Sequence, residues 1–258
     1  MKKILILLTL IIMCESPLLA QQKYTFSQFG SETLDFIKQP LKWDGSDWLK
    51  LGLVSAGTIL LMETADQPVR DLVLKDQSNF NSVPIEFGRI WGEIYTPIVL
   101  FGGFAIHSLL TNDIGTRKIA YEIGQASIYA GVVCYILKQA IGRARPYMNE
   151  GNGTFHPFSS IFGTDYASMP GGHNVAAFVL STVLSRNVTS VWLKVIAYIP
   201  AVLTFISRVY QDKHWISDDF SGAMLGYFIA TWVVDKHEGN KSPVEVSSVY
   251  PITIRIAL

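Results

Sequence analysis

The sequence predicts an all-α protein, a membrane-embedded bundle of about five to six core helices with its active site at one end. Three observations predict this fold. Hydrophobic residues make up 49% of the 258 residues, and charged residues only 16%, against about 25% in soluble domains. The mean hydropathy is +0.29. The apolar stretches lack strand-like alternation, and several approach the roughly 17 to 25 residues that cross a bilayer.

Six apolar stretches contain embedded Gly, Ala and Ser, which suits helices that pack closely. They lie at 51–62, 94–110, 119–137, 175–184, 191–206 and 220–234. The first is too short for a comfortable crossing, so we expect it to lie at the interface or to pack without crossing. The alternative is a soluble helical protein with buried helices, which the short stretch 175–184 favours.

The N-terminus has two lysines, an apolar run and a small residue at Ala20, as secretory signals do. Cleavage there leaves Cys134 as the only cysteine, which excludes an internal disulfide and a Cys-based metal site. Without the leader, 19 basic residues face 20 acidic ones, so no global positive field exists to hold nucleic acid. We expect a signal peptide (1–20), a polar lead-in (21–48), a helical domain (49–237) and a C-terminal tail (238–258).

The first polar cluster follows the third apolar stretch. Lys138 and Arg145 are seven residues apart, which places them on one side of a helix. Pro146 biases Arg145 out of helical geometry, so both cations can converge on an anion. Alone, each is equally typical of a solvated helix flank.

The second cluster runs from Ser168 to Asn174 and leads into the fourth stretch. Gly171 and Gly172 let backbone N–H groups approach a ligand, and a helix N-terminus favours negative charge. The segment is a candidate phosphate cradle. An ordinary turn capped by His173 or Asn174 is the alternative.

The third cluster lies between the last two stretches. His214 and Asp218 are at positions i and i+4, hence on one helical face. A carboxylate there can hold one imidazole N–H and leave the other ring nitrogen as a nucleophile. A purely structural hydrogen bond is the alternative.

Taken together, the clusters resemble the tripartite signature of the type 2 phosphatidic acid phosphatase superfamily, which also includes class A acid phosphatases and vanadium-dependent haloperoxidases. The matching segments are Lys138-x6-Arg145-Pro146, Pro170-Gly171-Gly172-His173 and Ser207-Arg208-x5-His214-x3-Asp218. The resemblance implies that His214 is the nucleophile that forms a phosphohistidine, that Asp218 orients it, and that His173 is the general acid. It also implies that no metal or other cofactor is needed and that phosphate is bound by Lys138, Arg145, Arg208, Gly171 and Gly172.

One position departs from the signature, because Gly171 stands where a serine is expected. The missing hydroxyl removes a hydrogen bond worth about 1.5 to 3 kcal/mol to a charged acceptor. The Gly171–Gly172 backbone or the Ser168 hydroxyl are alternative donors. We expect Gly171→Ser to leave activity equal or to raise it.

The membrane prediction makes a lipid phosphate or lipid pyrophosphate the expected substrate. The alternatives are a soluble exported acid phosphatase, a vanadate-dependent haloperoxidase, or a non-catalytic lipid-binding membrane protein. Basic residues favour the cytoplasmic side, so we expect the active site of a bacterial inner-membrane protein to face the periplasm. These basic residues, all in connections away from the clusters, are Arg117, Lys118, Arg186, Lys194, Lys236 and Lys241.

Overall fold

The computed structural model describes residues 24–159 and 163–238. Within these ranges the regular structure is helical, and the one β-type contact is an isolated bridge between Arg143 and Phe155. The all-α prediction is therefore confirmed. The predicted signal peptide and all of the predicted tail beyond residue 238 lie outside the described residues.

Each predicted apolar stretch is helical. The corresponding helices are α3 (Gly45–Thr64), α6 (Tyr95–Thr111), α7 (Ile114–Ile141), α8 (Gly172–Arg186), α9 (Val191–Ile196) with α10 (Ile199–Tyr210), and α11 (Ile216–His237). The shorter elements are α2 (Phe26–Ile37), η2 (Gln39–Lys42), α4 (Asp66–Leu74), α5 (Val83–Trp91) and η3 (Pro146–Met148).

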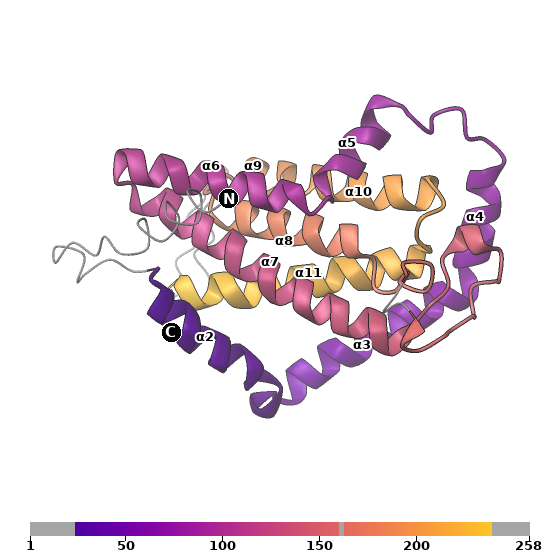
Figure 1. Ribbon diagram of the computed structural model, residues 1–258, viewed down its shortest axis with the longest axis horizontal. Helices are drawn as coiled ribbons and strands as arrows, with labels where there is room; N and C mark the ends of the chain where they lie inside the picture. The colour runs from indigo at the N-terminus through magenta and orange to yellow at the C-terminus, as the bar shows by residue number, and fades with distance from the viewer. Residues whose placement is uncertain (1–23, 160–162, 239–258) are drawn as a thin grey trace, which may run out of the picture.

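The centre of the bundle is the pair α8 and α11, flanked by α7 and α10 (Figure 1). Two glycines of α11 let its backbone approach the α8 segment. A Cβ at Gly222 would lie 2.3 Å from the Gly171 carbonyl oxygen, and one at Gly226 would lie 2.4 Å from the Val175 carbonyl oxygen. Small residues at a helix interface permit this close approach. The first turn of α11 is thereby held against the turn that opens α8.

Helix α7 ends sharply at Gly142, which has the left-handed φ of 62° that glycine adopts without strain. A Cβ at this position would lie 1.9 Å from the carbonyl oxygen of His156, so the returning loop also requires a glycine. This ending turns the chain so that Arg143 enters the bundle and Arg145 reaches the carbonyl oxygen of Thr164.

Among the described residues, α7 and the run Val191–Tyr210 are long and apolar enough to cross a membrane. The pairs α3–α4 and α5–α6, bent by 50° and 69°, pass the same criterion when each pair is taken as one span. Large apolar side chains of α6, such as Ile98, Val99 and Leu109, are exposed. The stretch 51–62 lies within α3, and its failure to cross stays a prediction.

The polar lead-in contains a helix, α2, that packs on the bundle. Phe36 stacks on Tyr129 with ring centroids 4.4 Å apart and meets Trp232 edge-on at 5.2 Å. Glu32 accepts hydrogen bonds from the Tyr121 hydroxyl and the Gln125 amide at 3.0 and 2.9 Å. Residues 26–37 therefore belong to the folded domain, which their polar composition did not indicate.

The α8–α11 contact generates a stability prediction. Gly226→Ala places a methyl group against the Val175 carbonyl and should lower the free energy of unfolding by about 1 to 3 kcal/mol. Gly131→Ala in α7 is the matched control, because its Cβ meets nothing within 4 Å. Thermal unfolding in detergent measures both. Equal stability of the two variants would contradict the close packing.

Candidate active site

The three clusters meet at one end of the bundle. They occupy the C-terminal parts of α7 and α10 and the N-terminal ends of α8 and α11, which lie together in Figure 1. The rings of His173 and His214 have centroids 6.1 Å apart. The Gly171 N–H donates to the Asp218 carbonyl at 2.7 Å, and a Cβ at Gly172 would lie 3.9 Å from Lys138 Nζ.

The predicted dyad is assembled with one difference. His214 Nδ1 and Asp218 Oδ2 are 4.0 Å apart, too far for a direct hydrogen bond. The Ser168 hydroxyl lies between them: it donates to Asp218 Oδ2 at 2.5 Å and is 3.5 Å from His214 Nδ1. Asp218 can therefore influence the imidazole of His214 electrostatically over 4.0 Å and through the Ser168 hydroxyl. The sequence had suggested Ser168 as an alternative hydrogen-bond donor to phosphate.

A fully buried arginine, Arg143, fixes the Asp218 carboxylate from the other side. Its Nη1 donates to Asp218 Oδ1 and to the Ser217 hydroxyl, each at 2.7 Å, and its Nη2 donates to Asp66 Oδ2 at 2.7 Å. Asp66, at the break between α3 and α4, also accepts from the Ser217 N–H at 2.9 Å. The Trp215 N–H donates to Asp218 Oδ2 at 3.0 Å. Asp218 therefore has an ion pair and two further donors.

Sequence reasoning missed Arg143 and Asp66. The signal for Arg143 was present, because it lies inside the first cluster, two residues before Arg145. Nothing local marks Asp66, which meets Arg143 across 77 residues and Ser217 across 151.

The two arginines of the candidate phosphate site are held by neutral oxygens. Arg145 donates to the carbonyls of Thr164 and Lys213 at 2.8 and 3.1 Å. Arg208 donates to the Ser207 hydroxyl at 3.2 Å and to the Gln211 side-chain oxygen. Neither arginine forms an ion pair within the described part of the chain. Their positive charge is therefore not cancelled by a carboxylate in direct contact.

Lys138 reaches the same region from α7. Its ammonium group donates to the carbonyls of Ala167 and Ser168 at 2.5 and 3.3 Å. These are the residues just before the turn that opens α8, so the lysine both anchors this turn and brings a third positive charge to it.

Both histidines are surrounded by these cations. Burial, then the positive charges of Arg208 and Arg145, lower the pKa of His173 to about 3. Burial and the same cations lower the pKa of His214 well below its usual value. Both rings are therefore neutral at pH 7 before an anion enters, and a neutral imidazole is the nucleophilic form.

Glu93 is a carboxylate near the site that sequence reasoning also missed. Its Oε1 lies 3.5 Å from His173 Nε2 and 3.3 Å from Arg89 Nη1. It is placed to stabilise the imidazolium form of His173 once the surrounding positive charge is reduced. No pattern in the sequence connects Glu93 with the second cluster.

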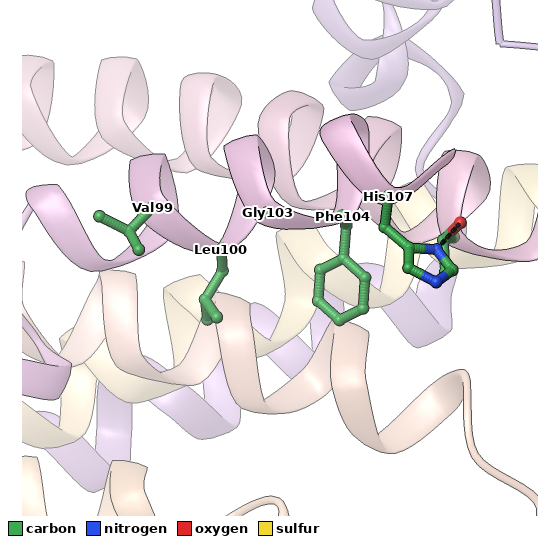
Figure 2. Close-up of a pocket in the computed structure, with 6 residues that line it drawn as sticks. Val99, Leu100, Gly103, Phe104 and His107 are labelled. Atoms are coloured by element: carbon green, nitrogen blue, oxygen red, sulfur yellow. Dashed lines mark hydrogen bonds between the residues drawn. The ribbon is translucent and has the colours of Figure 1, made fainter. Parts of the chain in front are cut away.

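Within the residues that the structure describes, His, Cys, Asp and Glu side chains form no group of three or more that could hold a metal ion. The independence from metal stays a prediction. An apolar groove, shown in Figure 2, is lined by Val99, Leu100, Gly103, Phe104, His107 and Thr116. Thr116 precedes Lys138 by 22 positions along α7, or about 33 Å at 1.5 Å per residue. This groove is therefore separate from the cluster of histidines and cations.

The model of the PAP2 superfamily matches residues 121–242, which include all three clusters. This segment of the chain resembles the PAP2 superfamily. The predicted resemblance is thereby confirmed.

Several phosphatases are similar to the chain. It is 36% identical over 78 residues to a lipid A 1-phosphatase of Porphyromonas gingivalis, covering 28% of this chain and 18% of that protein. It is 34% identical over 117 residues to an undecaprenyl-diphosphatase of Sulfolobus acidocaldarius, covering 45% and 53%. A lipid A 1-phosphatase of Rhizobium johnstonii is 29% identical over 204 residues, covering 72% and 78%. The chain thus spans about half or less of the first two relatives.

A solved structure shares the fold. The transmembrane PAP2-type phosphatidylglycerolphosphate phosphatase from Bacillus subtilis superposes with a TM-score of 0.51 at 18% identity, covering 75% of this chain and 94% of that one. This similarity confirms the helical membrane fold predicted from the sequence.

The buried Arg143 network generates a second stability prediction. Arg143→Gln leaves Asp66 and Asp218 without their cation and should cost about 3 to 5 kcal/mol of unfolding free energy. Arg186→Gln is the matched control, because its partners Asp235 and Glu238 lie nearer the surface and such a pair contributes about 0 to 1 kcal/mol. Chemical denaturation in detergent measures both. Similar losses would mean that the buried pair contributes no more than a surface one.

The His173 environment predicts a pH dependence. The pKa of His173 is about 3 in the folded protein and about 6.5 in an unfolded chain. Between these values the unfolded state binds more protons, so stability falls as the pH drops below about 6.5. His173→Gln should show a smaller loss of melting temperature between about pH 7.5 and about pH 5. A loss as large as in the unmodified protein would contradict the pKa assignment.

Proposed function

We propose that this protein is a membrane phosphatase that hydrolyses a lipid phosphate or lipid pyrophosphate through a phosphohistidine on His214, without a metal ion. The observation that carries the proposal is the convergence of two neutral histidines with Lys138, Arg145 and Arg208 at one end of a membrane-type bundle. Such a site binds a tetrahedral anion and presents a nucleophile to it.

In the first step His214 Nε2 attacks the phosphorus in line, and the bond from phosphorus to the leaving oxygen breaks as the N–P bond forms. The imidazolium that develops is stabilised by Asp218, 4.0 Å from Nδ1, and by the intervening Ser168. The phosphoryl oxygens keep most of their negative charge in a loose transition state, and the three cations stabilise it there.

His173 supplies the proton for the leaving oxygen. The bound phosphate offsets the positive charge of Arg208 and Arg145, which raises the pKa of His173 from its value of about 3 in the empty site. Glu93, 3.5 Å away, stabilises the protonated ring. In the second step, neutral His173 accepts a proton from the water that attacks the phosphohistidine, and inorganic phosphate is released.

The helical architecture supports a lipid substrate. The long apolar helices α7 and Val191–Tyr210 place the site at the end of segments that fit a bilayer. A headgroup phosphate can then meet the cations while acyl or prenyl chains stay in the apolar layer. These spans disfavour a soluble acid phosphatase, and the assembled dyad disfavours a binding protein without turnover.

Charge placement supports an outward-facing site in the inner membrane of a bacterium. Arg117 and Lys118 begin α7, Arg186 ends α8, and Lys236 lies in the last turn of α11. All are at the bundle end opposite the histidines (Figure 1). Because basic residues favour the cytoplasmic side, the active site faces the periplasm.

The mechanism predicts that His214→Ala lowers phosphate release by a factor on the order of 10³ or more. The assay uses purified protein with EDTA and a panel of phosphatidic acid, phosphatidylglycerol phosphate, undecaprenyl pyrophosphate and lipid A. His107→Ala is the matched control, because His107 is exposed on α6 and should keep full activity. Turnover by the His214 variant would refute the phosphohistidine, and loss of activity in EDTA would refute the metal-free reaction.

A further inference from the structure

Asp219, the residue after the dyad carboxylate, has an unusual position in the candidate active site. It is fully buried in the first turn of α11, with a relative exposure of 0%. Neither of its carboxyl oxygens has a hydrogen-bond partner of ordinary geometry. Buried polar groups of this kind are rare because leaving one unsatisfied costs free energy, so the carboxyl group requires an explanation.

The carboxyl group fills the space that a side chain at position 171 would occupy. A Cβ added to Gly171 would lie 2.4 Å from Asp219 Oδ1, a distance that excludes both groups from being present as they stand. Position 171 is the one that departs from the signature, where a serine hydroxyl is expected. The Asp219 carboxyl group can occupy this space only because residue 171 has no side chain.

Two of the other donors considered for this position, the Gly171 N–H and the Ser168 hydroxyl, are already engaged. The Gly171 N–H donates to the Asp218 carbonyl at 2.7 Å. The Ser168 hydroxyl donates to Asp218 Oδ2 at 2.5 Å. Neither supplies the missing hydrogen bond without giving up a contact that holds the dyad. The Asp219 oxygens make no hydrogen bond to the dyad, and the side chain that acts on them is the Asn174 amide.

The surroundings of Asp219 favour its neutral, hydrogen-donating form. Burial and the neighbouring charge of Asp218 raise the pKa of Asp219 well above its usual value. The Asn174 side chain, by hydrogen bonding, and the positive charges of Arg208 and Lys138 act in the opposite direction. A protonated carboxyl group has an O–H that donates a hydrogen bond, as an ionised one does not. The Asp219 carboxyl also lies within electrostatic reach of Arg145, so it shares the field of all three cations.

We propose that Asp219 is a phosphate-binding residue, whose carboxyl O–H donates to a phosphoryl oxygen in place of the signature serine. The inference deepens the proposed function and rests on it, because the ligand is the terminal phosphate of the substrate or the inorganic phosphate released. In this chain, Asp219 together with Gly171 would do what the serine does in the signature.

The first test measures the binding of inorganic phosphate by calorimetry, with product inhibition of lipid phosphate release as a second readout. Asp219→Val removes the donor at similar volume and should weaken phosphate binding about tenfold or more. Asp219→Asn restores an N–H donor and should lose clearly less. Asp235→Asn, at an exposed position of α11, is the control, and thermal unfolding verifies that each variant folds.

Two outcomes would overturn the proposal. Tighter phosphate binding by both Asp219 variants would mean that the residue is an ionised carboxylate that repels the anion. Unchanged binding in Asp219→Val would mean that it makes no contact with phosphate. If the unmodified protein binds phosphate but hydrolyses none of the lipids, the proposed function fails while this test of Asp219 still stands.

The second test exploits the shared space. Gly171→Ser alone should lower activity, because the new side chain meets Asp219 Oδ1; this reverses the expectation from the sequence. The double variant Gly171→Ser with Asp219→Ala should be more active than either single variant, because it removes the 2.4 Å contact and supplies the hydroxyl; the remaining backbone contacts of the new Cβ, at 3.1 Å, need a shift of only a few tenths of an ångström. A double variant no better than the singles, or a fully active Gly171→Ser, would contradict the pairing.

Discussion

The fully buried guanidinium group of Arg143 lies between the carboxylates of Asp66 and Asp218, at the end of the bundle that carries the candidate active site. Removing such charges from water is costly, and the cost is met only when the ion pair and its hydrogen bonds are complete. The position of Asp218 is therefore fixed by Arg143, which binds Oδ1, and by the Trp215 N–H, which binds Oδ2. Because α4, the turn after α7, and α11 each supply one member, Asp218 is fixed only when these segments have assembled.

Around this fixed carboxylate the site concentrates positive charge and keeps its histidines neutral. Burial and the neighbouring cations act in the same direction on the pKa values of His173 and His214. In the proposed mechanism an entering phosphate offsets that field, so the same cations that would bind the anion also control when His173 can become an acid. Binding and proton transfer are thus coupled through electrostatics, and Glu93 is placed where the imidazolium needs a counter-charge.

The pairing of Gly171 with Asp219 illustrates how a departure from a family signature can be internally consistent. Judged by position 171 alone, the chain lacks a phosphate donor. With the structure in view, the space is filled by a buried carboxyl group whose oxygens have no hydrogen-bond partner of ordinary geometry among the described residues. Substitutions within a tightly packed site act in pairs, because neighbouring side chains share one volume.

The sequence by itself determined the apolar helices and the identity of the three clusters, but not the shorter helices α2, α4 and α5. Apolar runs such as 119–137 and glycine turns such as Gly171–Gly172 are local patterns, and a helix end that carries a charge is visible without knowing its neighbours. The tertiary structure alone decided the contacts between distant segments: Ser168 with Asp218 across 50 residues and Arg143 with Asp66 across 77. It also decided that α2 packs on the bundle and that Asp219 fills the space at Gly171. The physical reason is that the burial of a side chain and its distance from a partner depend on how the helices pack. That packing involves several distant segments at once, so no single stretch of sequence predicts it.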